Sequence, residues 1–274
     1  MSHSLAPSTS TSTPFQTRYG PWALVAGASE GLGAAWAEGL AARGLNLILV
    51  ARRAEALEQT AREVRARHPV EVVPACFDLG APELLSSLAP VLAGREVGLY
   101  VHNAASTAQG PFLSRPLDDQ LKSLDVNCRA SLTLAHHFAH AMAARGRGGI
   151  ILMSSLTAFQ GTPYIATYGA TKAFNLVLAE GLQAELRAHG VDVMACCAGA
   201  TRTPGFLKSS PNGEPGELEP VQVVEEALGA LGKGALMIPG RFNRFASFFM
   251  QRVLPRAVAI RILESRTRNL KVSA

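Results

Sequence analysis

A buried apolar run that leads directly into closely spaced glycines constrains the fold of this chain most. Residues 22–26 read as a strand, and Gly27, Gly31 and Gly33 follow before a helical pattern begins near residue 34. Such a unit lets backbone N–H groups and a helix N-terminus approach a pyrophosphate. Gly27 would make the tight turn, Gly31 would admit the phosphate and Gly33 would let the helix pack on the strand. Glycine spacing alone is weak evidence in a chain with 25 glycines, but its strand–turn–helix context makes it specific.

Apolar segments alternate with amphipathic ones over most of the 274 residues. We expect strands near 22–26, 45–50, 70–75, 98–102, 149–154, 191–197 and 235–238, and helices near 31–43, 54–67, 82–93, 116–145, 164–189 and 221–231. A composition of 48% hydrophobic and 17% charged residues suits parallel strands buried on both faces. The pattern predicts an α/β protein with a single doubly wound parallel sheet, a Rossmann fold with helices on both faces, over residues 20–240.

A second constellation carries acid–base chemistry. Tyr168 and Lys172 are four residues apart, so they share one face of a helix, and Ser155 ends a predicted strand thirteen residues before the tyrosine. A phenol has an ordinary pKa of ~10, and a neighbouring ammonium would lower the pKa of Tyr168 by favouring the phenolate. Ser155 could hold a substrate oxygen that the phenol protonates, while Ser154 would point to the other face of its strand. These residues predict a carbonyl/alcohol redox site.

The glycine spacing, Ser155 and the Tyr168–Lys172 pair together resemble the short-chain dehydrogenase/reductase family, from about residue 20 to about residue 240. The resemblance implies that Asn127 completes a catalytic tetrad by holding a relay water. It also implies that Asp78 lies near the adenine and that Lys172 binds the nicotinamide ribose. The cofactor contacts expected in all are Gly27, Ser29, Glu30, Gly31, Leu32, Gly33, Arg52, Arg53, Asp78, Leu79, Asn103, Ala104, Ala105, Tyr168, Lys172, Gly199, Thr201 and Thr203.

The end of the second predicted strand bears on which cofactor binds. NAD-binding chains usually place a carboxylate there to accept from the ribose hydroxyls, whereas this chain has Arg52 and Arg53. A guanidinium can hold a 2′-phosphate through paired, charge-assisted hydrogen bonds. Glu30 gives no support, because NADP-preferring relatives often carry a basic residue in the glycine loop. We expect NADP(H), with NAD as the alternative.

The segment after the strand 191–197 resembles the family's nicotinamide side, where Gly199 matches the turn and Thr203 the carboxamide contact. The family's Pro-Gly is replaced by Ala198-Gly199, which puts the local backbone shape in doubt. Residues 204–220 are rich in proline and glycine and are predicted to form a mobile loop that closes over the substrate. Ser155, Tyr164 and Phe206 are the expected substrate contacts, with Phe112 near them, and they favour a hydrophobic carbonyl compound.

Two terminal segments lie outside this pattern. Residues 1–19 are expected to be a disordered tail and not a signal peptide, because they are rich in Ser, Thr and Pro and lack an apolar run. Residues 241–274 form a basic amphipathic extension in which phenylalanines 242, 245, 248 and 249 share a face with Val253 and Leu254. Such a helix can lie on a membrane surface. We expect the protein body or a neighbouring subunit to cover it, which makes membrane contact the minor alternative.

Other classes of function find little support. The net charge is +5 with an estimated pI of 9.3, but the basic residues are spread out and match no nucleic-acid reading motif, so no nucleic-acid partner is expected. His136 and His140 are one helical turn apart without a third ligand, so no metal is expected. No run of 18 apolar residues predicts a spanning helix. Four cysteines in or near predicted core elements suit a reducing cytoplasm.

These observations together predict an NADP(H)-dependent oxidoreductase that interconverts a ketone or aldehyde with an alcohol by hydride transfer and tyrosine acid–base catalysis. The family's subunit-pairing helices match residues 116–145 and 163–189, which implies a homodimer or homotetramer. An NAD-dependent alcohol or steroid dehydrogenase is the enzyme alternative. A peripheral membrane or scaffold protein that keeps nucleotide binding without turnover is the alternative of another class.

Overall fold

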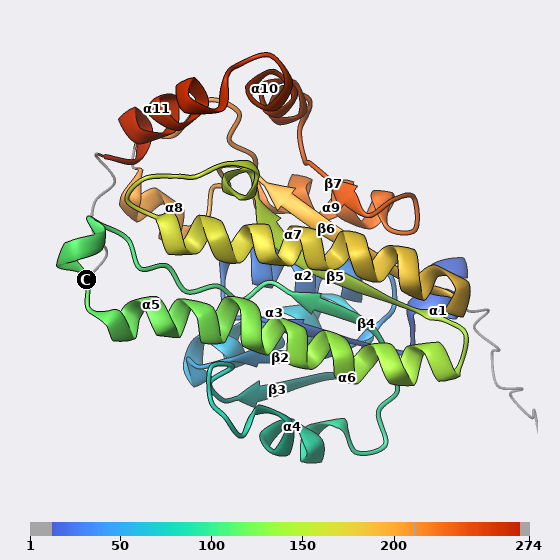
Figure 1. Cartoon of the computed structure of the whole chain (residues 1–274). Coiled ribbons are helices and arrows are strands. Elements are labelled where there is room, and N and C mark those ends of the chain that lie inside the picture. Colours follow the sequence, from blue (N-terminus) through green and yellow to red (C-terminus); the bar gives the residue numbers. More distant parts are fainter. Residues whose placement is uncertain (1–12, 211, 269–274) are drawn as a thin grey trace, which may run out of the picture.

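A seven-stranded, entirely parallel sheet forms the centre of the computed structural model, which describes residues 13–210 and 212–268 (Figure 1). The strand order is β3-β2-β1-β4-β5-β6-β7, so the chain reverses direction across the sheet between β1 and β4. This confirms the predicted doubly wound fold. The strands are β1 (Trp22–Ala26), β2 (Asn46–Ala51), β3 (Val72–Cys76), β4 (Val97–His102), β5 (Gly148–Ser155), β6 (Val191–Ala198) and β7 (Leu236–Met237).

Helices cover both faces of the sheet, and each face has its own apolar core. Helices α2, α3 and α9 pack on one face around Trp36, while α4, α6 and α7 pack on the other around Phe138. Cys196 and Cys197 belong to opposite cores, as strand alternation requires. These helices are α2 (Gly31–Ala41), α3 (Ala54–Arg67), α4 (Leu84–Leu92), α6 (Ala130–Ala144), α7 (Ala166–Leu186) and α9 (Pro220–Ala230).

Part of the N-terminal segment that the sequence predicts to be disordered forms a helix. Residues 1–12 lie outside the described residues, but Pro14–Tyr19 form helix α1, with Thr13 and Gln16 making a capping box. The Tyr19 hydroxyl donates to Asp192 Oδ2 at 2.6 Å, and Arg18 forms an ion pair with the same oxygen. The prediction of disorder is therefore wrong for residues 14–19, because their partner lies more than 170 residues away.

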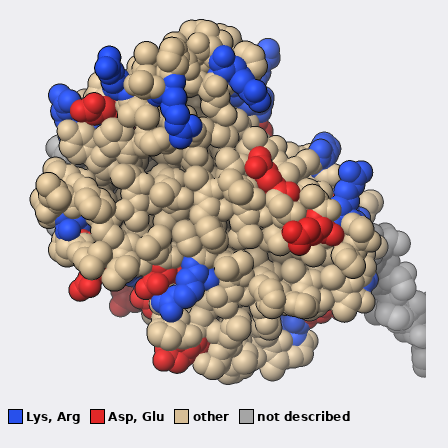
Figure 2. All heavy atoms as spheres, viewed as in Figure 1, with Lys and Arg blue, Asp and Glu red and all other residues tan. Residues whose placement is uncertain are grey.

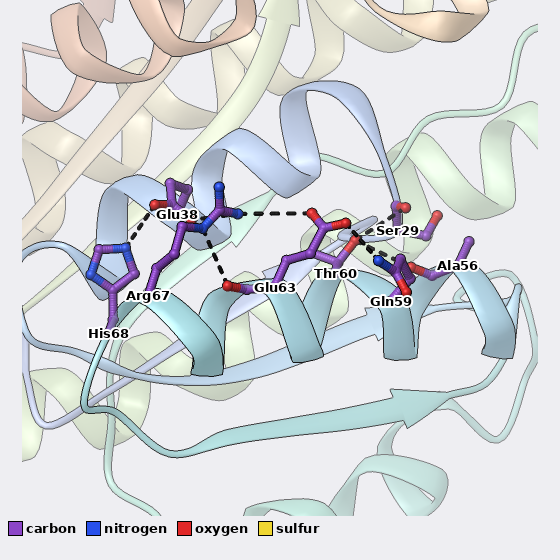
Figure 3. Close-up of polar contacts among 8 residues, drawn as sticks. All are labelled: Ser29, Glu38, Ala56, Gln59, Thr60, Glu63, Arg67 and His68. Carbon is purple, nitrogen blue, oxygen red and sulfur yellow. Dashed lines mark hydrogen bonds and ion pairs between the residues drawn. The ribbon is translucent and has the colours of Figure 1, made fainter.

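Helix α3 holds the glycine-rich turn from one side. The Thr60 hydroxyl lies 3.3 Å from the backbone oxygen of Ser29, which belongs to that turn (Figure 3). Near the C-terminal ends of α2 and α3, Glu38 of α2 contacts His68 at 2.7 Å and Arg67 at 3.1 Å. Contacts at both ends fix α3 against α2 and so keep the turn in place.

The C-terminal part adds two helices above the carboxyl end of the sheet, α10 (Arg241–Arg252) and α11 (Arg256–Thr267) (Figure 1). The predicted loop over residues 204–220 begins as a short helix, α8 (Pro204–Ser209), capped by the Thr203 side chain. Phe242, Phe245, Phe248 and Phe249 are between 41% and 69% exposed. The body of this chain therefore does not cover them, contrary to the first of the two arrangements that we expected.

Candidate functional site

A cavity of about 690 Å³ lies at the carboxyl ends of β1, β2, β3 and β4, beside the point where the strand order reverses. Open α/β sheets bind their ligands at this position. Thirteen predicted cofactor contacts line it, namely Gly27, Ser29, Glu30, Gly31, Leu32, Arg52, Arg53, Asp78, Leu79, Asn103, Ala104, Ala105 and Thr203. Ala51, Phe77, Ser106, Val126 and Gly205 also line it and were missed; Ala51, Phe77 and Ser106 directly adjoin predicted residues.

The three glycines have the separate roles that their order predicts. Gly27 has φ +85°, and a Cβ there would lie 2.6 Å from the Ala104 nitrogen. Gly31 has φ +55°, and a Cβ would meet the Thr203 side chain at 2.9 Å. Gly33 does not line the cavity, since a Cβ on it would lie 1.9 Å from the Gly27 carbonyl oxygen. Gly27 and Gly31 thus let the turn pass close to Ala104 and Thr203 at the edge of the cavity, whereas Gly33 lets α2 pack on the turn.

Two exposed arginines stand at the rim of this cavity. Arg52 Nη1 lies 3.9 Å from Asp78 Oδ2, and Arg53 pairs with Glu30 at 2.8 Å and with the Ser29 hydroxyl at 3.1 Å. Both arginine side chains are more than half exposed, so these pairs hold the guanidinium groups only weakly. An anionic group that enters the cavity can therefore recruit one or both arginines.

A second cavity of about 640 Å³ adjoins the first, because Ala105, Thr203 and Gly205 line both. Ser155, Tyr168 and Phe206 lie in its wall, as predicted for the substrate side, together with Gly199, which was predicted as a cofactor contact. Residues of the C-terminal helices complete the wall, and sequence reasoning did not place them there. They are Phe242, Asn243, Ala246, Ser247 and Met250 of α10, and Leu263, Arg266 and Thr267 of α11.

Tyr168 and Ser155 are brought together in that wall. Both line the same cavity, and burial raises the pKa of Tyr168 to about 12, with the Ser155 hydroxyl lowering it in part. Lys172 Nζ lies 5.4 Å from the tyrosine ring centroid and donates to the Met153 carbonyl at 2.9 Å. The Tyr168 shift is opposite to the depression that the sequence predicts, because the desolvation of the phenolate outweighs any help from Lys172. Burial also lowers the pKa of Lys172 to about 8.

The neighbouring serine has the separate place that strand alternation predicts. Ser154 is buried, and its hydroxyl donates to the Lys172 backbone oxygen at 2.7 Å. It therefore anchors α7 to the end of β5 and does not line the second cavity. Ser155 is the serine that faces the cavity.

Asn127 lies in a π-helical turn that interrupts the long helix predicted over residues 116–145. That segment consists of α5 (Leu117–Leu124), the π-helical turn (Asp125–Arg129) and α6. The Asn127 side chain is fully buried, accepts from the Ser106 N–H at 2.7 Å and donates to the Ser106 carbonyl and the Thr171 hydroxyl. Its backbone oxygen accepts from the Asn175 side-chain amide at 3.1 Å.

His102 supports the same turn and was not predicted. It is fully buried at the end of β4, with Nε2 at 3.1 Å from the Val126 carbonyl and Nδ1 at 2.6 Å from the Tyr100 hydroxyl. A carbonyl can only accept, so Nε2 carries the proton and Nδ1 accepts from Tyr100. Burial, with Lys172 nearby, lowers the pKa of His102 to about 3. The neutral imidazole therefore holds the residue next to Asn127.

This histidine should make stability depend on pH. Below pH ~6.5, His102 is protonated in the unfolded chain but stays neutral in the native state until the pH approaches 3. The free energy of unfolding should therefore fall as the pH drops from ~6.5 toward 3. We expect His102→Asn to show a smaller loss between pH 7.5 and pH 5 than the unmutated protein, measured by urea unfolding. An equal loss in both proteins would contradict the assignment.

Three further predicted residues, Thr201, Tyr164 and Phe112, do not line either cavity. Thr201 is buried and contacts the Gly199 carbonyl at 3.1 Å, so it supports the turn and lines neither cavity. Tyr164 also lines neither cavity, and Phe112 is 64% exposed. Tyr164 has a left-handed backbone conformation (φ 64°), and substrate contact by Tyr164 and Phe112 stays a prediction.

The histidine pair on α6 is exposed, with His136 Nε2 and His140 Nε2 3.2 Å apart. Within residues 13–210 and 212–268, no group of three His, Cys, Asp or Glu side chains is placed to hold a metal ion. Over the same residues, no helix is long and apolar enough to cross a membrane.

The chain is similar to known proteins over most of its length. The family model for short chain dehydrogenases matches residues 21–213. The 7beta-hydroxysteroid dehydrogenase of Collinsella aerofaciens is 34% identical over 233 residues, which are 83% of this chain and 89% of that protein. A very-long-chain 3-oxoacyl-CoA reductase of Podospora anserina is 36% identical over 179 residues, 64% of this chain and 53% of that protein.

Solved structures agree with this result. A 7beta-hydroxysteroid dehydrogenase structure superposes with a TM-score of 0.86 at 31% identity and covers 91% of this chain and 98% of its own. A short-chain dehydrogenase from Sphingobium yanoikuyae in complex with NADPH gives a TM-score of 0.75 at 30% identity, covering 86% and 96%. The chain therefore belongs to the short-chain dehydrogenase family of oxidoreductases.

Proposed function

We propose that the protein interconverts a ketone on a bulky, apolar molecule with the corresponding alcohol, as a hydroxysteroid dehydrogenase does, with NADP(H) as the hydride carrier. The observation that carries this proposal is that Tyr168 and Ser155 together line the wall of a cavity that adjoins the glycine-turn cavity. The relatives named as hydroxysteroid dehydrogenases support the substrate class.

The substrate cavity suits such a molecule in size and lining. At about 640 Å³ it is in the range of cavities that enclose drug-sized ligands. Large apolar side chains form much of its wall, including Leu156, Phe159, Ile165, Phe206, Met250 and Leu263. Close to Ser155 and Tyr168, the polar groups Thr157 and Gln160 also face it. A rigid apolar body with one carbonyl at the Tyr168 end matches this distribution.

The chain's own groups can then perform the proton part of the reaction. Ser155 would hold the carbonyl oxygen, and Tyr168, whose phenol is protonated at neutral pH with its pKa raised to about 12, would donate to it. Lys172 would bind the nicotinamide ribose, and the Asn127 carbonyl, which the Asn175 amide contacts, would hold the relay water. NADPH supplies the hydride when it is bound.

The residues of the first cavity fit the dinucleotide. Gly27 and Gly31 line the cavity in left-handed backbone conformations, and the N-terminus of α2, at Gly31 and Leu32, lines it too. Arg52 and Arg53 provide two mobile cations where an adenosine 2′-phosphate would be placed, which favours NADP(H) over NAD(H). The NADPH-bound structural relative supports the same preference.

Reversing the charge of Arg52 should reverse the cofactor preference. Arg52→Asp removes a charge-assisted contact and repels the 2′-phosphate, so NADPH binding should weaken roughly 10- to 100-fold while NADH binding is kept or improved. Titration followed by nucleotide fluorescence measures both affinities. Arg62→Asp, on the exposed side of α3, is the matched control and should leave both unchanged. Equal affinities of the unmutated protein for NADPH and NADH would refute the preference.

A substrate panel tests the reaction itself. We expect NADPH oxidation to be fastest with ring ketones such as oxo-steroids, and slower with small ketones, aldehydes and 3-oxoacyl thioesters. A clear preference for the thioesters would replace the proposed substrate class. Nucleotide binding without turnover of any compound would favour the scaffold alternative.

Self-association and location are further parts of the proposal. Exposed apolar side chains on α5 and α7, such as Leu117, Leu121 and Val177, would be covered in a homodimer or homotetramer.

Cytoplasmic location stays a prediction from the cysteines, all four of which are free thiols. Cys76 differs from the core position that we expected, since it is exposed.

A further inference from the structure

Helix α10 is oriented with its polar side toward the protein. Asn243 and Ser247 are only 3% and 6% exposed, and Asn243 Nδ2 donates to the Gly216 carbonyl at 3.0 Å and to the Pro239 carbonyl at 3.1 Å. A surface helix usually turns its apolar side to the core. These buried amide contacts fix the opposite orientation.

The outer side of α10 is consequently rich in exposed aromatic rings. Phe245 and Phe248 are 69% and 62% exposed, and Phe249 and Val253 are 41% and 55% exposed, while Phe242, which also lines the substrate cavity, is 54% exposed. The rings of Phe245 and Phe249 stack with their centroids 6.5 Å apart. A cluster of this kind on one helix marks an interaction surface.

The charge around this cluster is strongly positive. Residues 241–268 contain seven arginines and one glutamate, a net charge of +6, and α10 itself contains no carboxylate. Figure 2 shows blue side chains spread over the part of the molecule formed by α10 and α11. Arg244 and Arg268 have ion-pair partners, whereas no carboxylate of the described residues lies within ion-pair distance of Arg241 or Arg252. A partner of opposite charge fits this surface.

We infer that α10 binds the surface of an anionic lipid membrane, with its phenylalanine rings at the boundary of headgroups and acyl chains. Phe245 and Phe248 lie between Arg241 and Arg252 along the outer side, so the rings can enter the boundary while the guanidinium groups contact lipid phosphates. Basic side chains near an anionic leaflet gain further attraction.

A second copy of this chain fits the surface less well. Antiparallel pairing of α10 with its symmetry mate would place Arg241 opposite the mate's Arg252, and the helix offers no carboxylate to offset that repulsion. The exposed leucines of α5 provide a separate surface for self-association. An anionic membrane can bury the phenylalanine rings and pair its phosphates with the arginine side chains.

The inner side of the same helix lines the substrate cavity through Ala246 and Met250. Membrane binding would therefore place that cavity next to the lipid in which a bulky apolar ketone dissolves. This last point rests on the proposed function, whereas the binding itself does not.

Vesicle co-sedimentation of the full-length protein tests the inference. Vesicles of phosphatidylcholine alone are compared with vesicles of equal parts phosphatidylcholine and phosphatidylglycerol, at low and high salt. We expect binding to the anionic vesicles that high salt weakens. Phe245→Ser with Phe248→Ser should reduce binding about tenfold or more, because inserted aromatic area is lost. Arg241→Gln with Arg252→Gln should reduce it to a similar degree.

Matched controls separate these effects from general exposure and net charge. Leu113→Ser removes a 98% exposed apolar side chain elsewhere, and Arg62→Gln with Lys233→Gln removes two charges elsewhere. Both controls should bind as the unmutated protein does. Phe245 and Phe248 do not line the substrate cavity, so their variant should keep its turnover of a dissolved ketone.

Three results would overturn the inference: no binding to anionic vesicles, equal binding by the phenylalanine variant, or equal loss in the controls. Sedimentation velocity tests whether a second copy of this chain occupies the surface instead of a membrane. An oligomer that the phenylalanine variant dissociates, without vesicle binding, would assign α10 to a second copy. Vesicle binding without ketone turnover would refute the proposed function and leave the membrane surface standing.

Discussion

Replacing Tyr168 with phenylalanine should slow carbonyl reduction by about 10²–10⁴-fold, the range that general acid catalysis usually contributes. The ring remains, so packing in the cavity wall is kept, but the hydroxyl that would protonate the substrate oxygen is lost. The measurement is NADPH oxidation with the best ketone of the substrate panel.

NADPH binding separates this chemical effect from a loss of fold. Tyr168 lines the substrate cavity and not the glycine-turn cavity, so the phenylalanine variant should bind NADPH with nearly unchanged affinity in a fluorescence titration. Ser154→Ala is the matched control, because its hydroxyl faces the Lys172 backbone and not the cavity. Near-normal turnover of Tyr168→Phe would refute the assigned acid.

Gly33→Ala should cause the largest loss of stability of any single methyl addition that we predict. The added Cβ would lie 1.9 Å from the Gly27 carbonyl oxygen and 2.8 Å from Ala28 Cα, so backbone must move against backbone. Overpacking typically costs about 1–3 kcal/mol, and we expect a loss at or above the upper value in the free energy of unfolding. Urea unfolding measures it.

A second glycine provides the control for that experiment. A Cβ on Gly229, within α9, would have no atom of another segment within 4 Å. Gly229→Ala should therefore stabilise the protein, by up to about 1 kcal/mol, because glycine is the weaker helix former. If Gly33→Ala lowered the free energy of unfolding no more than Gly229→Ala does, α2 would not pack on the glycine turn as closely as described.

Local sequence patterns determined most of the fold and the centre of the site. Strand β1, the glycine turn and α2 were readable because apolar burial, turn geometry and helix packing act within about twenty residues. Alternation along β5 likewise separated Ser155 from Ser154, since neighbouring side chains on a strand point to opposite faces. The spacing of Tyr168 and Lys172 placed both on α7, although it could not give the direction of the Tyr168 pKa.

Only the tertiary structure decided what depends on distant partners. Helix α1 is held by Asp192, the turn around Asn127 is held by His102, and the α10 orientation is held by Asn243 reaching Gly216 and Pro239. The pKa of Tyr168 rises because surrounding elements exclude water from its hydroxyl, which no spacing along the chain records. A sequence shows which side chains are available at each position, whereas burial and long-range hydrogen bonds decide which of them face the protein, the cavity or the outside.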